Sequence, residues 1–229
     1  MRLDRLIAKV SGKNRRDVRA ILAGGKAEVN GVVVLNGRAE VGEFDQVVLD
    51  GETVQDRRPI YVMLNKPAGY VSATVDDELP TVMELLGDAF GEEALHIAGR
   101  LDRASTGLLL LTNDGKWSRR VTLPGEEHAK VYLVETAEDI AADTAETFAR
   151  GIYFGYEDIT TGPAQLEVLG QRRARLTIYE GKYHQVKRMF HAVGNRVVSL
   201  HRERVGAVSL DPDLAEGEWR ELRPEEIAG

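Results

Sequence analysis

A run of four consecutive leucines at positions 108–111 most constrains how this chain can fold. The run follows the sequence Gly-Arg-Leu-Asp at 99–102 and is followed by the turn-forming residues Asn-Asp-Gly at 113–115. A short continuous apolar run bounded by turns is typical of a buried strand. A loop rooted in a rigid strand keeps its side chains in fixed positions while leaving them accessible. The sequence therefore predicts a strand that positions Asp102, although an Arg-Asp-Arg surface cluster without function is the alternative.

The composition is that of an ordinary globular protein. Hydrophobic residues make up 43% of the 229 residues and charged residues make up 29%, which excludes a disordered chain. Because there is no cysteine, disulfides, thiol catalysis and cysteine-ligated zinc are excluded. The chain has no apolar run of membrane-spanning length, and its N-terminus lacks the apolar core of a signal peptide. We therefore expect a cytoplasmic protein that does not associate with membranes.

Positive charge is concentrated in two segments, although the whole chain carries a net charge of −7. Residues 1–38 contain nine lysines and arginines against three acidic residues, and residues 181–206 contain six against one. The acidic excess lies mostly elsewhere in the chain. Two separate basic segments on an acidic chain predict a polyanionic partner that contacts the protein at those places.

The first basic segment begins a small module of two helices and a short sheet. Apolar residues at positions 3, 6, 7 and 10 predict a first helix that ends at Gly12, and Asn14 can cap a second helix. The dipeptide Asn30-Gly31 between two apolar stretches predicts a type I′ hairpin. A third strand is predicted at residues 46–49.

Three arginines, Arg15, Arg16 and Arg19, lie on the outward side of the predicted second helix. Their grouping predicts an RNA-docking face, and a solvated charged helix is the alternative. The sequence at 2–7, the basic second helix and the turn at 29–31 resemble the alpha-L RNA-binding domain, which is named after a small-subunit ribosomal protein. This resemblance implies that the first module binds RNA.

Residues 50–59 are polar, contain a proline and lack apolar periodicity, and we interpret them as a linker. This interpretation places one domain at 1–58 and a second at 59–229. In the second domain, strands are predicted at 60–64, 108–112, 130–134 and 173–178, and helices at 81–86 and 139–150. Because strands outnumber helices of crossover length, we expect an α+β domain with a mixed, mostly antiparallel sheet.

The second basic segment, at 181–194, has the pattern of an amphipathic helix. Apolar residues at 186, 189, 190 and 193 form one face, and His184, Lys187, Arg188 and His191 repeat the same spacing on the adjacent face. One side would pack on the core while the other presents two cations and two imidazoles. Metal binding is not expected, because the two histidines are seven residues apart and no acidic ligand is near. An ordinary surface helix is the alternative.

Four short motifs follow the first module in order. They are Asn-Lys-Pro-Ala-Gly at 65–69, Gly-Arg-Leu-Asp at 99–102, Lys-Val-Tyr at 130–132 and Gly-Lys-Tyr-His-Gln-Val-Lys-Arg at 181–188. Together they resemble the pseudouridine synthases of the RsuA/RluB type, and the similarity extends to about residue 206. That family isomerises uridine in RNA by breaking the N-glycosidic bond, rotating the uracil and reattaching it through carbon. The resemblance implies a pseudouridine synthase domain that needs no cofactor and no metal.

The resemblance also implies a role for individual residues. Asp102 is the essential carboxylate, acting either as a nucleophile on the base or sugar or as a base at the ribose C2′. Lys187 corresponds to the basic partner of that aspartate, which is arginine in many relatives. Arg188 is the alternative partner and is also expected to bind RNA. Tyr132 corresponds to the aromatic residue that stacks on the target base. Arg100 is placed to fill the gap left by a flipped-out uridine.

Two further stretches, at 184–190 and 200–206, are more similar to enzymes acting on small-subunit ribosomal RNA than to large-subunit enzymes. We therefore expect a cytoplasmic monomer that isomerises a specific uridine in 16S ribosomal RNA during ribosome biogenesis. One alternative is a pseudouridine synthase acting on 23S ribosomal RNA. Another is a non-catalytic RNA-binding protein of ribosome assembly, which would not need to keep Asp102, Tyr132 and Lys187 together.

Overall fold

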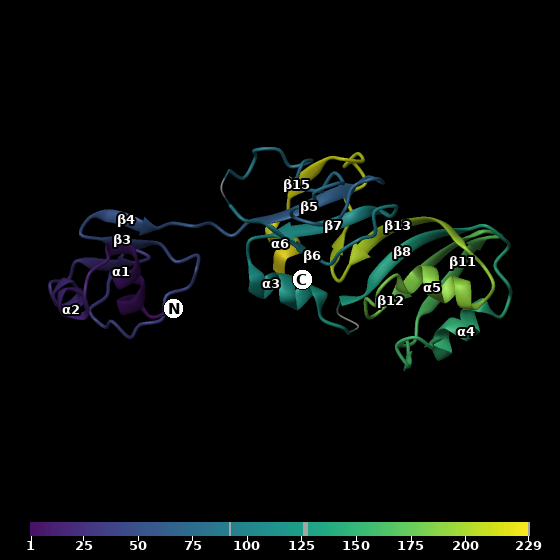
Figure 1. Cartoon of the computed structure of the whole chain (residues 1–229), viewed down its shortest axis with the longest axis horizontal. Coiled ribbons are helices and arrows are strands. Elements are labelled where there is room, and N and C mark those ends of the chain that lie inside the picture. Colours follow the sequence, from purple (N-terminus) through teal and green to yellow (C-terminus); the bar gives the residue numbers. More distant parts are fainter. Residues whose placement is uncertain (92, 126–127, 229) are drawn as a thin grey trace. The chain divides into compact units, whose positions relative to one another are not determined.

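The computed structural model describes residues 1–91, 93–125 and 128–228. The chain divides into two compact units, residues 1–59 and residues 60–229 (Figure 1). None of the described helices combines the length and the apolarity that are needed to cross a membrane.

The first unit contains both predicted helices, α1 (Leu3–Ser11) and α2 (Arg15–Ala23). Gly12 adopts a left-handed conformation with a φ of 64° and ends α1, a conformation that glycine adopts without a steric penalty. The Asn14 side chain accepts hydrogen bonds from two backbone N–H groups in the first turn of α2, so it is the N-cap. The apolar faces of both helices pack on the sheet in one core, which includes Leu3, Leu6, Ile7, Val18, Leu22, Ala27, Val41 and Val47.

The sheet of the first unit has four strands in the order β2-β1-β3-β4. Their bounds are β1 Ala27–Val29, β2 Val32–Val33, β3 Val47–Leu49 and β4 Glu52–Gln55. Asn30 and Gly31 have φ angles of 51° and 76°, as a type I′ turn requires. The predicted hairpin is therefore confirmed.

The interpretation of residues 50–59 as a linker is wrong for the first part of that segment. Asp50 and Gly51 form a second turn with positive φ angles of 53° and 85°, and β4 pairs with β3 behind it. The strand is only four residues long and its side chains are largely polar, so it has no apolar alternation that could reveal it. The connection between the units is consequently shorter than expected.

The second unit is built on a nine-stranded sheet with the order β11-β12-β8-β13-β7-β5-β15, to which β14 and β6 add at β13 and β7. The bounds of its strands are β5 Tyr61–Lys66, β6 His96–Ala98, β7 Thr106–Thr112, β8 Lys130–Thr136, β11 Gln165–Gly170, β12 Arg173–Ile178, β13 Val197–Val205, β14 Val208–Ser209 and β15 Trp219–Glu221. A separate pair is formed by β9 (Tyr153–Phe154) and β10 (Ile159–Thr160).

One parallel contact divides this sheet into two antiparallel halves. Strands β11, β12, β8 and β13 pair antiparallel, as do β7, β5 and β15, whereas β13 and β7 run parallel. The parallel register joins His201 to Thr106 and Arg202 to Gly107. The predicted mixed, mostly antiparallel sheet is therefore confirmed.

Helices cover both halves of the sheet (Figure 1). They are α3 (Gly115–Thr122), α4 (Thr144–Arg150), α5 (Gln185–Ala192) and α6 (Pro224–Ala228). α4 contacts β11 and α5 contacts β13, while α3 contacts β6 and β7. The leucine run is buried on both faces of the sheet. Leu109 and Leu111 belong to one hydrophobic core cluster, and Leu108 and Leu110 belong to a second one. Burial on both faces explains why the run is continuous rather than alternating.

Two predicted helices differ from the structure. Residues 81–86 form a series of turns rather than a helix, although Glu84 accepts the capping-box hydrogen bond from the Thr81 backbone N–H at 2.7 Å. The backbone hydrogen bonds here reach only the third preceding residue, as from the Leu86 N–H to the Met83 carbonyl. Gly87 then has a φ of 54°, which ends the series of turns. The predicted helix at 139–150 begins only at Thr144, because the backbone N–H of Ile140 is bonded to the Gln171 carbonyl instead.

Candidate active site

The loop that carries Asp102 is held by hydrogen bonds from a second loop, which follows β5. The Ser72 hydroxyl donates to the Leu101 carbonyl at 2.8 Å and accepts from the Leu101 N–H at 3.1 Å. Gly69 donates its N–H to the Arg103 carbonyl at 2.8 Å. These bonds lie on both sides of Asp102, so the backbone on which its carboxylate is mounted is fixed.

Lys66 fixes the same loop from inside the protein. This lysine is fully buried at the end of β5, and its ammonium donates to the carbonyls of Pro67, Arg103 and Ser105 at 2.8–3.2 Å. Burial lowers the pKa of Lys66 to about 8, the negative charge of Asp102 opposes this shift, and the positive charge of Arg202 adds to it. The motif at 65–69 contains Lys66 but indicates no role for it, because two of its three partners are backbone carbonyls nearly forty positions away.

Arg202 supports the beginning of the loop. Its guanidinium is buried, with 1% of the residue exposed, and donates to the carbonyls of Gly99 and Leu108 at 2.8 Å each and to that of Arg100 at 3.3 Å. Arg202 thus ties the loop before Asp102 to the strand after it. No local pattern could have revealed this role, since Arg202 lies about a hundred positions from the carbonyls that it binds.

Asp102 contacts two side chains from the start of α5. The Lys187 ammonium lies 2.6 Å from Oδ2 of Asp102, and His184 Nε2 lies 3.3 Å from Oδ1. Arg188 is not a partner, because its guanidinium pairs with Glu157 at 2.7 Å. The structure therefore favours the first of the two predicted partners, Lys187, and contradicts the alternative.

The helical pattern predicted the place of His184 beside Lys187 but not its contact with Asp102. His184 immediately precedes α5 and has left-handed backbone angles of φ 48° and ψ 30°, which are uncommon for residues other than glycine. Its ring stacks on that of Tyr183 with 3.9 Å between the ring centroids. The spacing of His184 and Lys187, three positions apart on one helix face, was the available signal.

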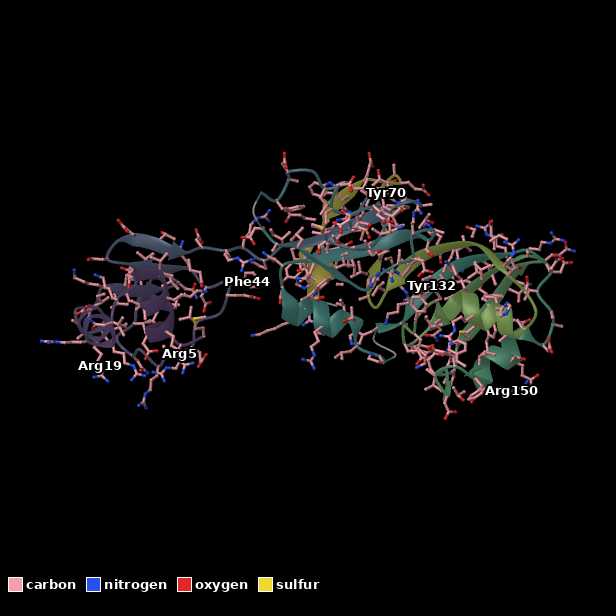
Figure 2. The ribbon with its side chains drawn as sticks, viewed as in Figure 1. Arg5, Arg19, Phe44, Tyr70, Tyr132 and Arg150 are labelled. Atoms are coloured by element: carbon pink, nitrogen blue, oxygen red, sulfur yellow. The ribbon has the colours of Figure 1, made fainter. Side chains whose placement is uncertain are left out.

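These groups surround a cavity of about 610 Å³. Its lining includes Arg100, Asp102, Lys130, Tyr132, Tyr183, His184, Lys187 and Arg202. Tyr132 is largely buried, with 7% of the residue exposed, and Figure 2 shows it within the second unit. Burial, reinforced by the charge of Arg202, lowers the pKa of Lys130 beside it. The cavity thus places a carboxylate, its cationic partner and an aromatic ring around one space, and within the described ranges no group of three or more acidic or histidine side chains could hold a metal ion.

A second cavity, of about 720 Å³, lies within the first unit. Five arginines line it: Arg2, Arg5, Arg15, Arg19 and Arg38. Arg5 and Arg19 lie on the same side of this unit (Figure 2). Of the three arginines predicted to dock RNA, Arg16 is exposed but does not line the cavity.

Comparison with known proteins identifies the family. Residues 60–192 match the model of a family described as RNA pseudouridylate synthase. The chain belongs to this family. It is 52% identical over 228 residues to the ribosomal small subunit pseudouridine synthase A of Pseudomonas aeruginosa, covering 99% of each chain. It is 48% identical to the protein of the same name from Escherichia coli, covering 100% of this chain and 99% of the other.

A solved structure of a pseudouridylate synthase shares the fold over the full length. Its TM-score is 0.72 at 40% identity, with 100% of this chain and 98% of the other covered. The protein is therefore an RNA pseudouridine synthase with an α+β fold, as the motifs predicted. The matched region includes the segments that carry Asp102, Tyr132 and Lys187.

Proposed function

We propose that this pseudouridine synthase converts a specific uridine of small-subunit (16S) ribosomal RNA to pseudouridine, with Asp102 as its essential carboxylate. The observation that carries the proposal is the position of that carboxylate, 2.6 Å from the Lys187 ammonium at a cavity that Tyr132 also lines. The choice of RNA is supported by relatives that are 48–52% identical over their whole length and are named for the ribosomal small subunit.

The chemistry assigns a part to each of these residues. The isomerisation breaks the bond between C1′ and N1 of uracil, forms a bond between C1′ and C5, and transfers the C5 proton to solvent while N1 gains one. Asp102 acts on the nucleotide either as a nucleophile or as a base at C2′, and both routes need the ionised carboxylate, which an adjacent ammonium stabilises. Tyr132 stacks on the uracil, and Arg100 at the cavity rim occupies the gap that the flipped nucleotide leaves.

In this proposal, the first unit contributes affinity for the RNA substrate. Its arginine-lined cavity carries the charge that phosphate groups of RNA require. Arg15 and Arg19 contact phosphates from the cavity, and Arg16 contacts them from the adjoining surface of α2. We place this unit, with its two helices and small sheet, among the alpha-L RNA-binding domains, and the enzyme acts as a cytoplasmic monomer.

Mapping pseudouridine in transcribed ribosomal RNA tests the proposal. The purified enzyme is incubated separately with 16S and 23S transcripts, and each new pseudouridine is located by chemical labelling and primer extension. We expect one new site in the 16S transcript and none in the 23S transcript. Modification confined to 23S RNA would select the large-subunit alternative, and no modification of either would favour a binding protein.

The Asp102→Asn variant tests the assignment of the carboxylate. The amide keeps the shape of the side chain but can act neither as a nucleophile nor as a base. We expect the variant to lose turnover while its affinity for the 16S transcript stays within about a few-fold of the wild type. Turnover retained by the purified variant would remove Asp102 from the reaction.

A further inference from the structure

The mouth of the active-site cavity carries an aromatic side chain that the reaction does not use. Tyr183 lines the cavity but 75% of it is exposed, whereas 7% of Tyr132 is exposed. The two rings therefore lie at different depths. Since Tyr132 is the ring placed for the reacting uracil, Tyr183 is available for something else.

One contact restrains the ring of Tyr183, and two hydrogen bonds restrain the backbone around it. Its ring stacks on the His184 ring with 3.9 Å between centroids and 20° between planes. Its carbonyl accepts a hydrogen bond from Arg188 at 3.3 Å, and Arg188 is itself anchored on Glu157. The preceding residue, Lys182, donates its N–H to the buried Gln185 side chain at 2.9 Å. Because the ring is stacked and the backbone that carries it is held, this exposed tyrosine is a preorganised platform.

A stacking platform would lower the free-energy cost of flipping the target uridine out of its stack. When one nucleotide leaves its stack, the neighbouring base loses a stacking partner, and this loss is part of the cost of flipping. An aromatic ring beside the pocket restores the stacking for any base, because every base has a π-face. The ring of Tyr183 meets this requirement at the cavity mouth, next to the carboxylate that His184 contacts.

We infer that Tyr183, backed by His184, binds the base of the nucleotide next to the target uridine by stacking. This inference rests on the proposed function for the identity of the RNA, although the stacking itself requires only a single-stranded base. The His184 ring stacks on Tyr183 and its Nε2 lies 3.3 Å from the Asp102 carboxylate. A base bound on the platform is therefore connected to this carboxylate through His184.

A double-mutant cycle that combines a Tyr183 substitution with an abasic RNA position tests the stacking contact. The RNA is a 16S fragment that the wild type converts, synthesised with single abasic positions on each side of the target uridine. For the wild type we expect one abasic position to raise KM by about tenfold. Tyr183→Leu should raise KM by a similar factor on intact RNA and by no more on that abasic RNA, because both changes remove the same contact. Tyr183→Phe keeps the aromatic face, so it should retain the increase in KM that the abasic position causes in the wild type.

Tyr156→Leu is the matched control, since 98% of Tyr156 is exposed and it does not line the cavity. Its effect should be near zero on every RNA. If the effects of Tyr183→Leu and of each abasic position simply multiply, the stacking contact does not exist. Affinity for oligouridylate gives a readout independent of the 16S assignment: Tyr183→Leu should weaken it and Tyr156→Leu should not. Weakened oligouridylate binding without conversion of any 16S fragment would refute the proposed substrate alone, whereas unchanged binding would refute the platform.

Discussion

The carboxylate of Asp102 is contacted by two side chains, Lys187 from α5 and His184 from the residue that immediately precedes this helix. The two residues are three positions apart, and they reach different oxygens of the carboxylate. Because each oxygen has its own partner, the orientation of the carboxylate is fixed as well as its position. The Lys187 ammonium makes a single strong contact, where an arginine could make two parallel ones, and His184 contacts the remaining oxygen.

The first prediction separates Lys187 from its neighbour Arg188. Lys187→Met removes the ammonium beside Asp102 and should lower kcat by about a hundredfold, with little change in RNA affinity. Lys187→Arg should restore much of the activity because it keeps the charge. Arg188→Met should leave kcat within about a few-fold of the wild type, since Arg188 pairs with Glu157. Single-turnover rates at saturating RNA measure all three, and a larger loss in Arg188→Met than in Lys187→Met would reverse the assignment.

The second prediction concerns the buried ammonium of Lys66. Its pKa is about 8 in the folded protein, whereas a lysine ordinarily has a pKa of 10.5. Between these pH values the unfolded chain binds more protons, so stability rises with pH. The free energy of unfolding of the wild type, relative to Lys66→Met, should therefore increase by up to about 3 kcal/mol as the pH rises through this range. Urea unfolding at several pH values measures the difference, and a pH-independent difference would contradict the burial of a charged lysine.

At the scale of the elements, β7 approaches β13 very closely at Gly107. A Cβ atom on Gly107 would lie 2.4 Å from the carbonyl oxygen of Arg202 and 2.7 Å from its nitrogen, and Gly107 has a φ of 98°. Both the contact and the backbone angle exclude other residues. This close approach brings the backbone of β13 near enough for the Arg202 side chain to reach the loop before Asp102.

The third prediction follows from that contact. Gly107→Ala must separate β7 from β13 and should destabilise the protein by about 3 kcal/mol or more, with a loss of activity because the Asp102 loop moves. Gly115→Ala is the control, since a Cβ there meets no atom within 4 Å, and it should change stability by less than about 1 kcal/mol. Thermal unfolding compares the two variants. Equal stability of both would mean that the strand junction tolerates a side chain.

Elements set by local chemistry could be predicted from the sequence, and those set by distant contacts could not. Asn14 as a cap and the turn at Asn30-Gly31 each depend on a few adjacent residues, and both were correctly predicted. The strand β4 and the late start of α4 depend on pairing with other segments. The same holds in the active site, where motifs indicated Asp102 and its partner but the supports from Lys66 and Arg202 run through backbone carbonyls that no motif encodes.

At the scale of the whole molecule, the acidic chain keeps a cluster of arginines in its first unit. The fourth prediction is that replacing Arg15, Arg16 and Arg19 with alanine raises KM far more than it lowers kcat. The logarithm of the RNA association constant should also fall less steeply with the logarithm of the salt concentration. The slope should be smaller in magnitude by about two to three, because each lost phosphate contact removes roughly one released counterion. Arg150→Ala is the control, since Arg150 pairs with Glu146 on α4 and lines neither cavity. An unchanged slope in the triple variant would show that this face of α2 does not contact RNA.

The parallel pairing of β7 with β13 has a consequence for the folding of the enzyme during its synthesis. It joins residues 106–107 to residues 201–202, so a long segment must be ordered before the two halves of the sheet can close. During translation the chain emerges from its N-terminus, and Asp102 leaves the ribosome well before α5 and β13 supply Lys187 and Arg202. A nascent or truncated chain that stops before β13 carries Asp102 without the Arg202 contacts that hold its loop. If Asp102 is the essential carboxylate, as proposed, we expect activity toward RNA only when synthesis of the enzyme is nearly complete.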